Sequence, residues 1–454
     1  MLFFLSRIIT VVLRCLVLNR IVLAAIPLDI DDSQSVRFAA SLVARGIQSL
    51  YQPNATNGIV GKWPYPPYFW WESGGAWGAM IEYWHYTNDT TYNSITYQAL
   101  THQLSLEAFN TGNDDRAFWV VVAMSAAEYN FREPVAPLPS WLQVVINAWE
   151  VFAHRWVIDS STCGGGLRWQ FQENMAGWNY KNAISNSLFF QISARLARFT
   201  GNDTYLEFSH QIWAWTTSIG MIDDMYNVYD GSDVLLNCSK LDHHQWTYNV
   251  GAFLYGAAVL ANYTNSSTAW VQRTAGLLEA IGTFAYCELP TPNTCNLDQL
   301  SMKAYLARWL AGTTLVAPFT AAQVGAILRT SASGAAAACD STGQICGSKW
   351  YLNGSDGTTG LGQQLAVLEI MYALLVNQTA PPATQPQVQI GLQAANITDI
   401  LRTVTATLPS TSGTARPLFD GPKGASHSLT AGKEILDRLG RLSIPFLTCL
   451  MNLY

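Results

Sequence analysis

The chain has 454 residues with a formal net charge of -6, and charged residues make up only 12% of it. So little charge argues against a long disordered chain, and the acidic balance lacks the basic surface that nucleic-acid binding needs. Aromatic residues also reach 12%, with 17 Trp and 20 Tyr, which is typical of a protein that lines a binding groove with rings.

The first segment, residues 1–25, is apolar but interrupted by Arg7, Arg14 and Arg20. It ends in small residues and lacks the uninterrupted run of about 18 apolar residues that a membrane span needs, so a cleaved secretory signal peptide is expected, with a membrane anchor as the alternative. Nine Asn-X-Ser/Thr sequons also favour secretion: Asn54, Asn88, Asn202, Asn237, Asn262, Asn265, Asn353, Asn377 and Asn396.

Helical patterns then follow one another along most of the chain. Acids at residues 29–32 suit the first turn of a helix, whose dipole favours them, and the first pattern runs to Gln48. The other patterns are separated by breaks with Gly, Asn or Pro and span residues 76–86, 93–109, 115–130, 140–156, 181–199, 205–219, 248–263, 269–286, 298–311, 321–339 and 361–376. No stretch shows the sustained period of two that strands require. About a dozen helices in one helical toroid are therefore expected.

Residues 63–78 are rich in proline and aromatic side chains. The prolines exclude a helix at the start, so we expect a loop that presents rings before a helix beginning near Ala76. Each ring alone suits hydrophobic packing. Grouped beside Glu72, rings such as Trp70 and Trp71 suit a sugar platform, because pyranose faces carry C–H groups that stack on aromatic faces.

Two adjacent carboxylates, Asp114 and Asp115, follow a turn-forming Thr-Gly-Asn and precede a run from Ala117 to Ala127 whose only polar side chain is Ser125. A helix that is apolar all round is buried on every side. Acids at the end of such a helix are costly unless they have partners or shifted pKa values, which favours a functional role.

The spacing of the two acids suits glycoside hydrolysis. Neighbouring carboxyl groups on a helix can lie about 5 to 6 Å apart, which is the separation of a nucleophile and an acid/base catalyst in retaining glycosidases; inverting enzymes need roughly 6.5 to 9.5 Å. One ionised carboxylate disfavours ionisation of its neighbour, so a nucleophile stabilised by helix-end N–H groups leaves the other acid protonated.

Other interpretations of the acids stay open at this point. An Asp-Asp pair is often only a helix cap. Prenyl-chain enzymes bind Mg²⁺ through Asp-Asp-X-X-Asp, but Phe118 occupies the position of the third ligand. Residues 29–32 resemble the acid motif of some terpene cyclases, which would make the protein a metal-dependent cyclase. We expect no metal and no cofactor.

Six cysteines lie between the first segment and the extreme tail, and an even number in a secreted protein predicts disulfides. Short spacings favour Cys287 with Cys295 and Cys339 with Cys346, which leaves Cys163 for Cys238. A zinc site is the weaker interpretation, because no Cys-X-X-Cys is present.

Beyond Asn377 the chain is rich in Pro, Thr, Ser and Gly, which predicts a disordered stalk. Its last residues, 442–454, are apolar and follow small residues, as in a signal for a glycosylphosphatidylinositol anchor, but they are few and include Pro445 and Asn452. Anchored and released forms both stay open. The expected division is a signal peptide at 1–25, a catalytic domain at 26–378 and a tail at 379–454.

A resemblance to a known family adds to these patterns. Residues 111–119 and 126–131 closely resemble the signature of glycoside hydrolase family 76, and in particular of its fungal cell-wall mannan endo-1,6-α-mannosidases. Further matching segments follow in the same order between about Leu28 and Leu375: residues 68–72, 163–170, 180–186, 226–231, 245–249 and 295–299.

The resemblance implies an all-α (α/α)6 barrel and retaining action on α-1,6-linked mannose, with Asp114 as nucleophile and Asp115 as acid/base. It also implies a transglycosylation in which the mannan-like core of a glycosylphosphatidylinositol glycan is transferred to wall glucan. The implied substrate is therefore α-1,6-mannan or this core glycan, the acceptor water or glucan, and the location the cell wall or the outer face of the plasma membrane. A non-catalytic sugar-binding wall protein is the alternative from another class.

Several residues are expected to bind the sugar. Asp230 lies in an Asp-Gly that alone would predict a turn, and Tyr248-Asn249 belongs to a matching motif. The remaining candidates are polar residues near the acids or in matching segments and tryptophans as platforms: Trp70, Trp71, Glu72, Asn113, Trp169, Lys181, Asn182 and Trp246.

Overall fold

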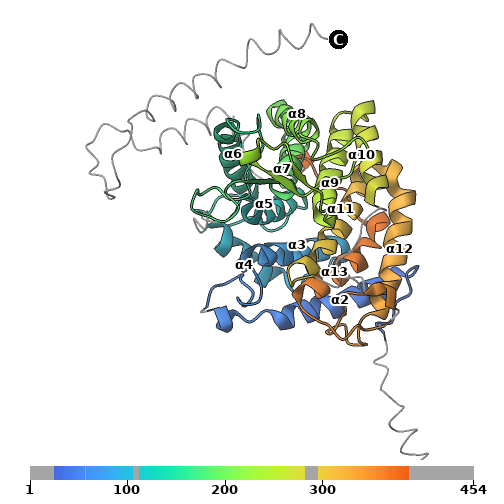
Figure 1. Ribbon diagram of the computed structural model, residues 1–454. Coiled ribbons are helices and arrows are strands. Elements are labelled where there is room, and N and C mark those ends of the chain that lie inside the picture. Colours follow the sequence, from blue (N-terminus) through green and yellow to red (C-terminus); the bar gives the residue numbers. More distant parts are fainter. Residues whose placement is uncertain (1–24, 57, 106–111, 282–294, 353, 388–454) are drawn as a thin grey trace, which may run out of the picture. The chain divides into compact units, whose positions relative to one another are not determined.

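The computed structural model describes residues 25–56, 58–105, 112–281, 295–352 and 354–387, which form two concentric layers of helices (Figure 1). The inner layer is a closed ring in which each helix packs against the next and the last packs against the first. In order, it consists of α3 (Trp70–Thr87), α5 (Asn113–Glu128), α7 (Ala183–Thr200), α9 (Thr247–Tyr263), α11 (Met302–Val316) and α13 (Leu361–Ala373).

The outer layer alternates with the inner one along the chain. Each outer helix packs on an inner helix that precedes or follows it, except the first, which packs on the last: α2 (Ser33–Leu50) on α13, α4 (Asn93–Ser105) on α3, α6 (Trp141–Asp159) on α5, α8 (Asp203–Ser218) on α7, α10 (Thr268–Ala280) on α9 and α12 (Ala321–Ala337) on α13. The described chain is therefore an (α/α)6 barrel, which confirms the expected all-α fold.

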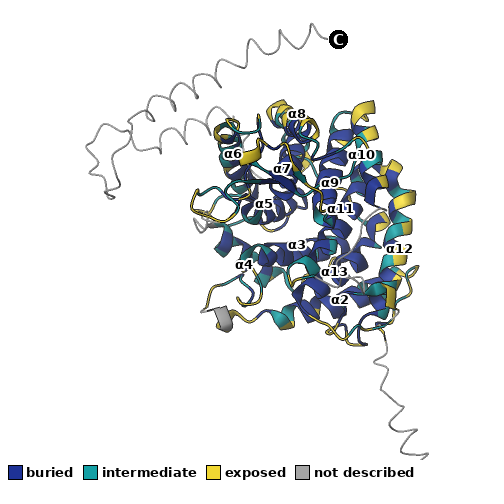
Figure 2. Cartoon of the chain, viewed as in Figure 1, coloured by how far each residue is buried: buried dark blue, intermediate teal, exposed yellow. Residues whose placement is uncertain are grey.

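The inner helices are buried on all sides, whereas the outer helices are buried on one face only. The inner helix α5 is buried along its whole length except at Asp114 and Asp115, which are partly exposed, and α13 is buried throughout. Outer helices such as α10 bury only one stripe, and their other faces are exposed (Figure 2). Because an inner helix has neighbours on every side, its sequence is apolar all round, as the run after Asp115 predicted.

Side-chain caps define where several helices begin. The Oδ1 atom of Asp32 accepts a hydrogen bond from the Gln34 N–H at 2.9 Å, and Ser140 accepts one from the Gln143 N–H at 3.2 Å. Asn182 and Asn202 cap α7 and α8 in the same way. Such bonds satisfy backbone donors that have no partner within the helix. The acid motif at residues 29–32 is thus a helix start.

Helix α3 differs from the prediction, because it begins at Trp70 and not near Ala76. Glycines normally weaken a helix, but those of α3 are places of close approach. A Cβ atom on Gly74 would lie 3.0 Å from the Trp119 ring, and one on Gly75 would collide with the Tyr305 hydroxyl. The glycines therefore let α5 and α11 pack against the start of α3, and the predicted loop of rings ends at Phe69.

Three short strands were also not predicted. They form an antiparallel sheet in the order β1 (Tyr180–Asn182), β2 (Gly231–Asp233) and β3 (Leu241–Asp242), in which Lys181 pairs with Ser232. Strands of two or three residues are too short to produce a detectable alternation. The sheet leads directly into α7.

The described chain continues after α13 through short 3₁₀ turns, η7 (Val376–Gln378) and η8 (Gln385–Gln387). The Ala383 N–H donates to the Glu128 carbonyl at 3.0 Å, and Arg198 donates to the Pro382 carbonyl at 2.8 Å. Residues up to 383 therefore pack on the barrel. The expected signal peptide up to residue 24, the rest of the tail from 388, and the predicted helix ends at 106–109 and 282–286 lie outside the described residues.

No single helix in the described ranges is long and apolar enough to cross a membrane; only α11 and α12, with the turns before them and a 120° bend between them, meet the length and composition together.

Candidate active site

The acid pair lies at the N-terminal end of α5, where both side chains are partly exposed. The two carboxyl groups make different contacts with the backbone. Asp115 Oδ2 accepts a hydrogen bond from the Gly112 N–H at 3.2 Å, and Asp114 Oδ1 accepts one from the Asp115 N–H at 2.9 Å. Both acids thus use donors at the end of the helix, where its dipole also favours negative charge.

Asn113 positions this end of the helix but does not face a ligand, which corrects its predicted role. It is buried, its side-chain Nδ2 donates to the Arg168 carbonyl at 2.8 Å, and its backbone N–H donates to the Trp169 carbonyl at 2.9 Å. Its Oδ1 accepts from Arg155. Because each polar group is bonded within the protein, Asn113 anchors α5 to the segment around residue 168.

Burial raises the pKa of both acids, that of Asp115 to about 6 and that of Asp114 well above its ordinary value, and the neighbouring Asp115 charge raises the pKa of Asp114 further. The pair therefore shares one proton over a range of pH. Burial alone would place this proton on Asp114. Hydrogen bonds oppose this, because Asp114 accepts from two backbone N–H groups and from Asn182, whereas Asp115 accepts from Gly112.

Gly112 is required by the position of the acids. A Cβ atom at this residue would collide with Asp114 Oδ1 and would lie 3.1 Å from Gln170 Nε2. We expect Gly112→Ala to displace the Asp114 carboxylate and to lower turnover by about 10²-fold or more, because reacting groups tolerate little misplacement. Steady-state kinetics should show this loss of turnover, and denaturant unfolding should show a free energy of unfolding that changes too little to explain it.

The control for this variant is Gly325→Ala on α12, where a Cβ atom meets nothing within 4 Å. It should keep full activity and gain up to about 1 kcal/mol of stability, since alanine is the better helix former. Normal turnover in Gly112→Ala would show that this contact does not hold the acid in place.

Asn182, Tyr180 and Asp230 bring the small sheet to the acid pair. Asn182 caps α7 and also donates its side-chain hydrogen bond to Asp114. The Tyr180 hydroxyl donates to Asp230 Oδ2 at 2.9 Å, and Asn249 Nδ2 lies 3.4 Å from Asp230 Oδ1. Burial raises the pKa of Asp230. The predicted Asn182 thus contacts Asp114, and the predicted Asn249, itself buried, contacts the partly exposed Asp230.

Aromatic rings from three inner helices surround Phe118, one turn after the acids. Its ring lies 4.7 Å from that of Trp71, 4.9 Å from that of Tyr305 and 6.4 Å from that of Tyr248. Trp71 and Tyr248 are partly exposed. Trp246, the residue before α9, is also partly exposed and stacks on His244 with 6.2 Å between the ring centres. These three predicted rings remain candidate sugar contacts.

Trp70 lies elsewhere, contrary to the prediction. Its indole N–H donates to Gln103 Oε1 at 2.8 Å, and its ring stacks on Trp119 at 5.3 Å. It lines a pocket with residues of α4, α5 and α6 that include Arg116, and neither Asp114 nor Asp115 lines that pocket. Successive residues of a helix point about 100° apart, and here Trp70 contacts Gln103 of α4 whereas Trp71 contacts Phe118, so the two rings lie at different places.

Trp169 keeps its predicted role as a candidate platform. Its side chain is 37% exposed, and its ring packs against Gly177, where a Cβ atom would collide with it. Its backbone N–H donates to the Tyr180 carbonyl at 2.6 Å, and its carbonyl accepts from Asn113. The ring is therefore fixed beside the start of α5 with part of its surface free.

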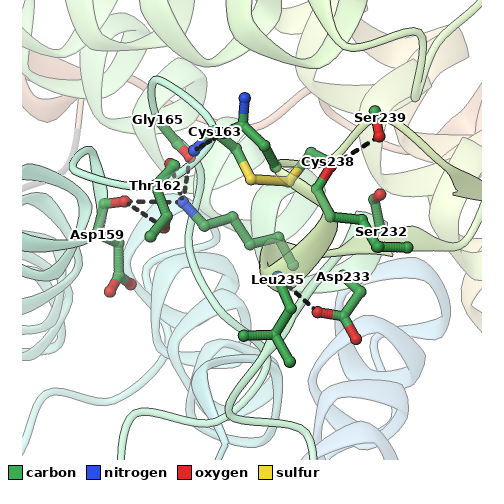
Figure 3. The surroundings of a disulfide bond; sticks show 12 residues. Asp159, Thr162, Cys163, Gly165, Ser232, Asp233, Leu235, Cys238 and Ser239 are labelled. Carbon is green, nitrogen blue, oxygen red and sulfur yellow. Dashed lines mark hydrogen bonds between the residues drawn. A yellow bond between two sulfur atoms is a disulfide. The ribbon is translucent and has the colours of Figure 1, made fainter.

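Lys181 does not face the acids, which corrects another prediction. It is fully buried, and its ammonium group donates to the carbonyls of Asp159 and Thr162, each at 2.8 Å, and to that of Gly165. An ammonium has three donors, and all three are used. Figure 3 shows these carbonyl residues beside the disulfide between Cys163 and Cys238.

Two of the three predicted disulfides are confirmed, Cys163–Cys238 and Cys339–Cys346. Cys295 is also disulfide-bonded, and its predicted partner Cys287 lies outside the described residues. The first disulfide joins the loop that holds the ammonium of Lys181 to the loop between β2 and β3, so it fixes the sheet that carries Asn182.

Glu72 is fully buried and caps α3, so it does not contact a sugar as predicted. Its Oε2 accepts from the Phe69 N–H at 2.7 Å, whereas its Oε1 has no hydrogen-bond partner among the described residues. Burial raises the pKa of Glu72 to about 7, against the Phe69 hydrogen bond, and nearby Asp298 raises it further.

This shift predicts a pH dependence of stability. Glu72 ionises near pH 4.5 when unfolded and near 7 when folded, so its contribution is complete below 4.5 and is lost as pH rises through 7, at most about 3 kcal/mol. Between pH 4.5 and 8, the free energy of unfolding of Glu72→Gln should fall less than that of the unmodified protein. Denaturant unfolding at both pH values measures this, with exposed Glu279→Gln on α10 as control; an equal fall would contradict it.

The carboxyl groups and rings at this end of the barrel form one cluster around Asp114 and Asp115. Three residues of this cluster were not predicted. Asp298, at the turn η4 (Gln299–Ser301) before α11, lies close enough to Glu72 and Tyr248 to raise their pKa values. Tyr180 binds Asp230, and Phe118 joins the rings. Asp298 and Tyr180 fall in segments that matched the family, which was the available signal.

The cluster thus joins the N-terminal ends of α3, α5, α7, α9 and α11. Two partly exposed acids, further carboxyl groups and rings are suited to sugar binding and acid–base chemistry. In the described part of the chain, no three His, Cys, Asp or Glu side chains come together as metal ligands would.

Comparison with known proteins defines the class. The sequence profile of glycosyl hydrolase family 76 matches residues 35–386. The chain therefore belongs to this family.

Individual proteins are also similar to this chain over most of its length. Mannan endo-1,6-alpha-mannosidase DCW1 of Eremothecium gossypii is 40% identical over 379 residues, which cover 79% of this chain and 83% of the relative. A crystal structure of Dfg5 from Chaetomium thermophilum in complex with glucosamine matches with a TM-score of 0.74 and 35% identity, over 79% of this chain and 95% of that one.

A more distant structure has the same fold. It is an inactive variant of an α-1,6-mannanase from Salegentibacter, with two consecutive aspartates replaced by asparagine, in complex with α-1,6-mannotriose. Its TM-score is 0.63 at 16% identity, over 75% of this chain and 99% of that one.

Proposed function

We propose that this protein is a retaining, endo-acting glycosidase or transglycosidase that cleaves α-1,6-mannosidic linkages. The observation that carries the proposal is the acid pair, held at the open end of a buried helix with one shared proton and unequal hydrogen bonding. The mannan endo-1,6-alpha-mannosidase at 40% identity supports the substrate. The replaced aspartates in the inactive mannanase support the pair as the reactive groups.

In the first step, the Asp114 carboxylate bonds to the anomeric carbon while Asp115 gives its proton to the glycosidic oxygen, and the bond from carbon to that oxygen breaks. In the second step, Asp115, now a carboxylate, takes a proton from the attacking water or sugar hydroxyl, and the bond to Asp114 breaks. Two inversions restore the original configuration. Asp115 regains its proton and the pair returns to its starting state.

The neighbours of the pair support these roles. The amide of Asn182 stabilises the Asp114 carboxylate before the attack. Asp230, bonded to Tyr180, can accept hydrogen bonds from sugar hydroxyls, and the rings of Trp71, Trp169, Trp246 and Tyr248 offer faces for stacking. These side chains come from α3, α9, β1 and the loops between the elements.

Transfer to a sugar is the second reaction of the same site, since it differs only in the acceptor. The Dfg5 structure with glucosamine supports an amino sugar in the bound glycan. We propose a glycosylphosphatidylinositol core glycan as donor and wall glucan as acceptor in this reaction. The sequons and the apolar first segment support a secreted protein at the cell wall, with or without a lipid anchor on the tail.

The shared proton predicts a pH profile. The reactive form of the pair carries one proton, so kcat/KM should rise as pH rises through about 6, where the first proton leaves, and should fall at higher pH when the second leaves. Rates with an α-1,6-mannan oligosaccharide from pH 4 to 8 test the rise. Activity that falls through pH 6 would contradict a pair that reacts with one shared proton.

The proposed function is tested by product analysis. A defined α-1,6-mannan oligosaccharide should be cut internally and, when a β-glucan acceptor is added, joined to it. Shorter mannans alone in both mixtures would identify a hydrolase, and a joined product a transglycosidase. Binding without any product, by protein that folds normally, would instead favour the non-catalytic wall protein.

A further inference from the structure

The end of the barrel opposite the acid pair is formed by the C-terminal ends of the inner helices. Arg198, near the end of α7, donates to Asn262 Oδ1 in the last turn of α9 at 2.9 Å, and Asn262 Nδ2 donates to the Val316 carbonyl at the end of α11 at 3.0 Å. Tyr86 of α3 and Tyr372 of α13 stack at 5.0 Å. The inner helices therefore all point the same way, with the acids at one end and these residues at the other.

Five of the sequon asparagines in the described ranges lie at this C-terminal end. Asn88 is the C-cap of α3, and Asn202 follows α7 as the N-cap of α8. Asn262 and Asn265 lie in and just after the last turn of α9, and Asn377 lies in η7 after α13. By contrast, Asn237 lies on the sheet side, where its Oδ1 accepts from Cys163 at 3.3 Å, and Asn54 follows the C-terminal end of α2, which runs opposite to the inner helices.

The side-chain amides of these five residues differ in what they bind. Asn88, Asn265 and Asn377 are exposed, and no described residue forms a hydrogen bond with their side chains. Asn202 uses only Oδ1, which accepts from the Thr204 N–H at 2.9 Å. Asn262 is different, because both ends of its amide are used between α7 and α11.

We propose that the C-terminal end of the barrel carries N-linked oligosaccharides on Asn88, Asn202, Asn265 and Asn377, and that Asn262 stays unmodified. The proposal rests on the secretion included in the proposed function. In the modification, Nδ2 bonds to the anomeric carbon of an oligosaccharide on a lipid diphosphate, the bond from that carbon to the diphosphate oxygen breaks, and the amide proton passes to a base of the transferase.

Asn262 is also exposed, and it is excluded because both ends of its amide are bound within the fold. A sugar on Nδ2 would occupy the position where this atom lies 3.0 Å from the Val316 carbonyl, beside the Arg198 guanidinium. Chains modified there would lose the contact that joins α7, α9 and α11. Asn265 lies three residues later in a turn with a φ of 51°, and its amide has no such bonds to lose.

The arrangement separates two surfaces of the enzyme. Four bulky hydrophilic chains would surround the end where residues 379–383 pack, and would keep polymers and other proteins away from it. The end with Asp114 and Asp115 stays free of these four chains. A long mannan can then reach the acids from the solvent side without meeting these four chains.

The test is glycopeptide mapping of the full chain secreted from a eukaryotic host. Enzymatic release of the glycans in ¹⁸O water converts each modified asparagine to labelled aspartate, which mass spectrometry locates. We expect label at Asn88, Asn202, Asn265 and Asn377 and none at Asn262. Label at Asn262 in place of Asn265, absence of label from the four sites, or retention of an unmodified chain in the cytosol would overturn the proposal.

Variants complete the experiment. Asn88→Gln, Asn202→Gln, Asn265→Gln and Asn377→Gln combined should lose the glycan-dependent mobility shift of these sites and keep mannan turnover. Asn262→Gln should leave the glycan map unchanged. The result is independent of catalysis: an unmutated protein that is glycosylated but inactive would contradict the proposed function alone, and an unmutated protein that is active without these glycans would contradict this proposal alone.

Discussion

Asp114→Asn should lose turnover of an α-1,6-mannan oligosaccharide by about 10⁴-fold or more, because the amide can neither attack the anomeric carbon nor leave it. The fold should persist, since asparagine keeps the shape and one acceptor for the Asp115 N–H. Initial rates and circular dichroism of the same samples measure both effects. Near-normal turnover in this variant would exclude Asp114 as the nucleophile.

Asp115→Asn separates the second role from the first. It should be as slow as Asp114→Asn on the oligosaccharide but should recover the first step on an aryl α-mannoside whose leaving group needs no proton, seen as a burst of released aryl group before the second step, which still lacks its base. Asp203→Asn on α8, whose carboxylate accepts from Tyr263 at 2.8 Å far from the pair, is the control and should keep its activity. Absence of this burst in Asp115→Asn would contradict its role as acid.

The largest expected loss of stability is at Arg308, inside the ring of inner helices. Its Nε lies 3.0 Å from both carboxyl oxygens of Glu369, and it also donates to the Gly75 carbonyl at 2.8 Å. The Arg308 side chain is 6% exposed and that of Glu369 is fully buried. Arg308→Met leaves Glu369 as an unpaired buried charge, so we expect the free energy of unfolding to fall by about 3–5 kcal/mol.

Thermal and denaturant unfolding measure this loss. The double variant with Glu369→Gln should recover part of it, because the unpaired charge is removed as well. The matched control is Arg329→Met, whose partner Asp31 is 74% exposed and which should change stability by less than about 1 kcal/mol. Equal effects of the two arginine variants would contradict the importance of burial.

The sequence predicted those features that depend on neighbouring residues. Asp114 and Asp115 next to an apolar run identified the start of an inner helix, since surrounded helices lack a polar face. Short spacing between cysteines predicted Cys339–Cys346. The closed ring of six helices, however, was expected only through the family resemblance, because helical periodicity does not show which helices pack together.

Three of the wrong predictions at the site share one cause. Asn113, Lys181 and Glu72 are polar residues near the acids, and their sequence positions do not reveal that the fold buries all three and bonds them within the protein, except at Glu72 Oε1. Lys181 is an example, since its carbonyl partners at Asp159, Thr162 and Gly165 are 16 or more residues away. Conversely, Asp298 reaches Glu72 and Tyr248 only because the inner helices start at one end of the barrel.

The most direct test of the chemistry is to trap the glycosyl-enzyme. A fluorinated mannosyl fluoride reacts with the nucleophile but leaves it slowly, so peptide mass mapping can identify the modified residue. A mannosyl group on Asp114 is the predicted result. Modification of Asp115 or of another carboxyl group, or an inverted product without any adduct, would contradict the proposed division of roles.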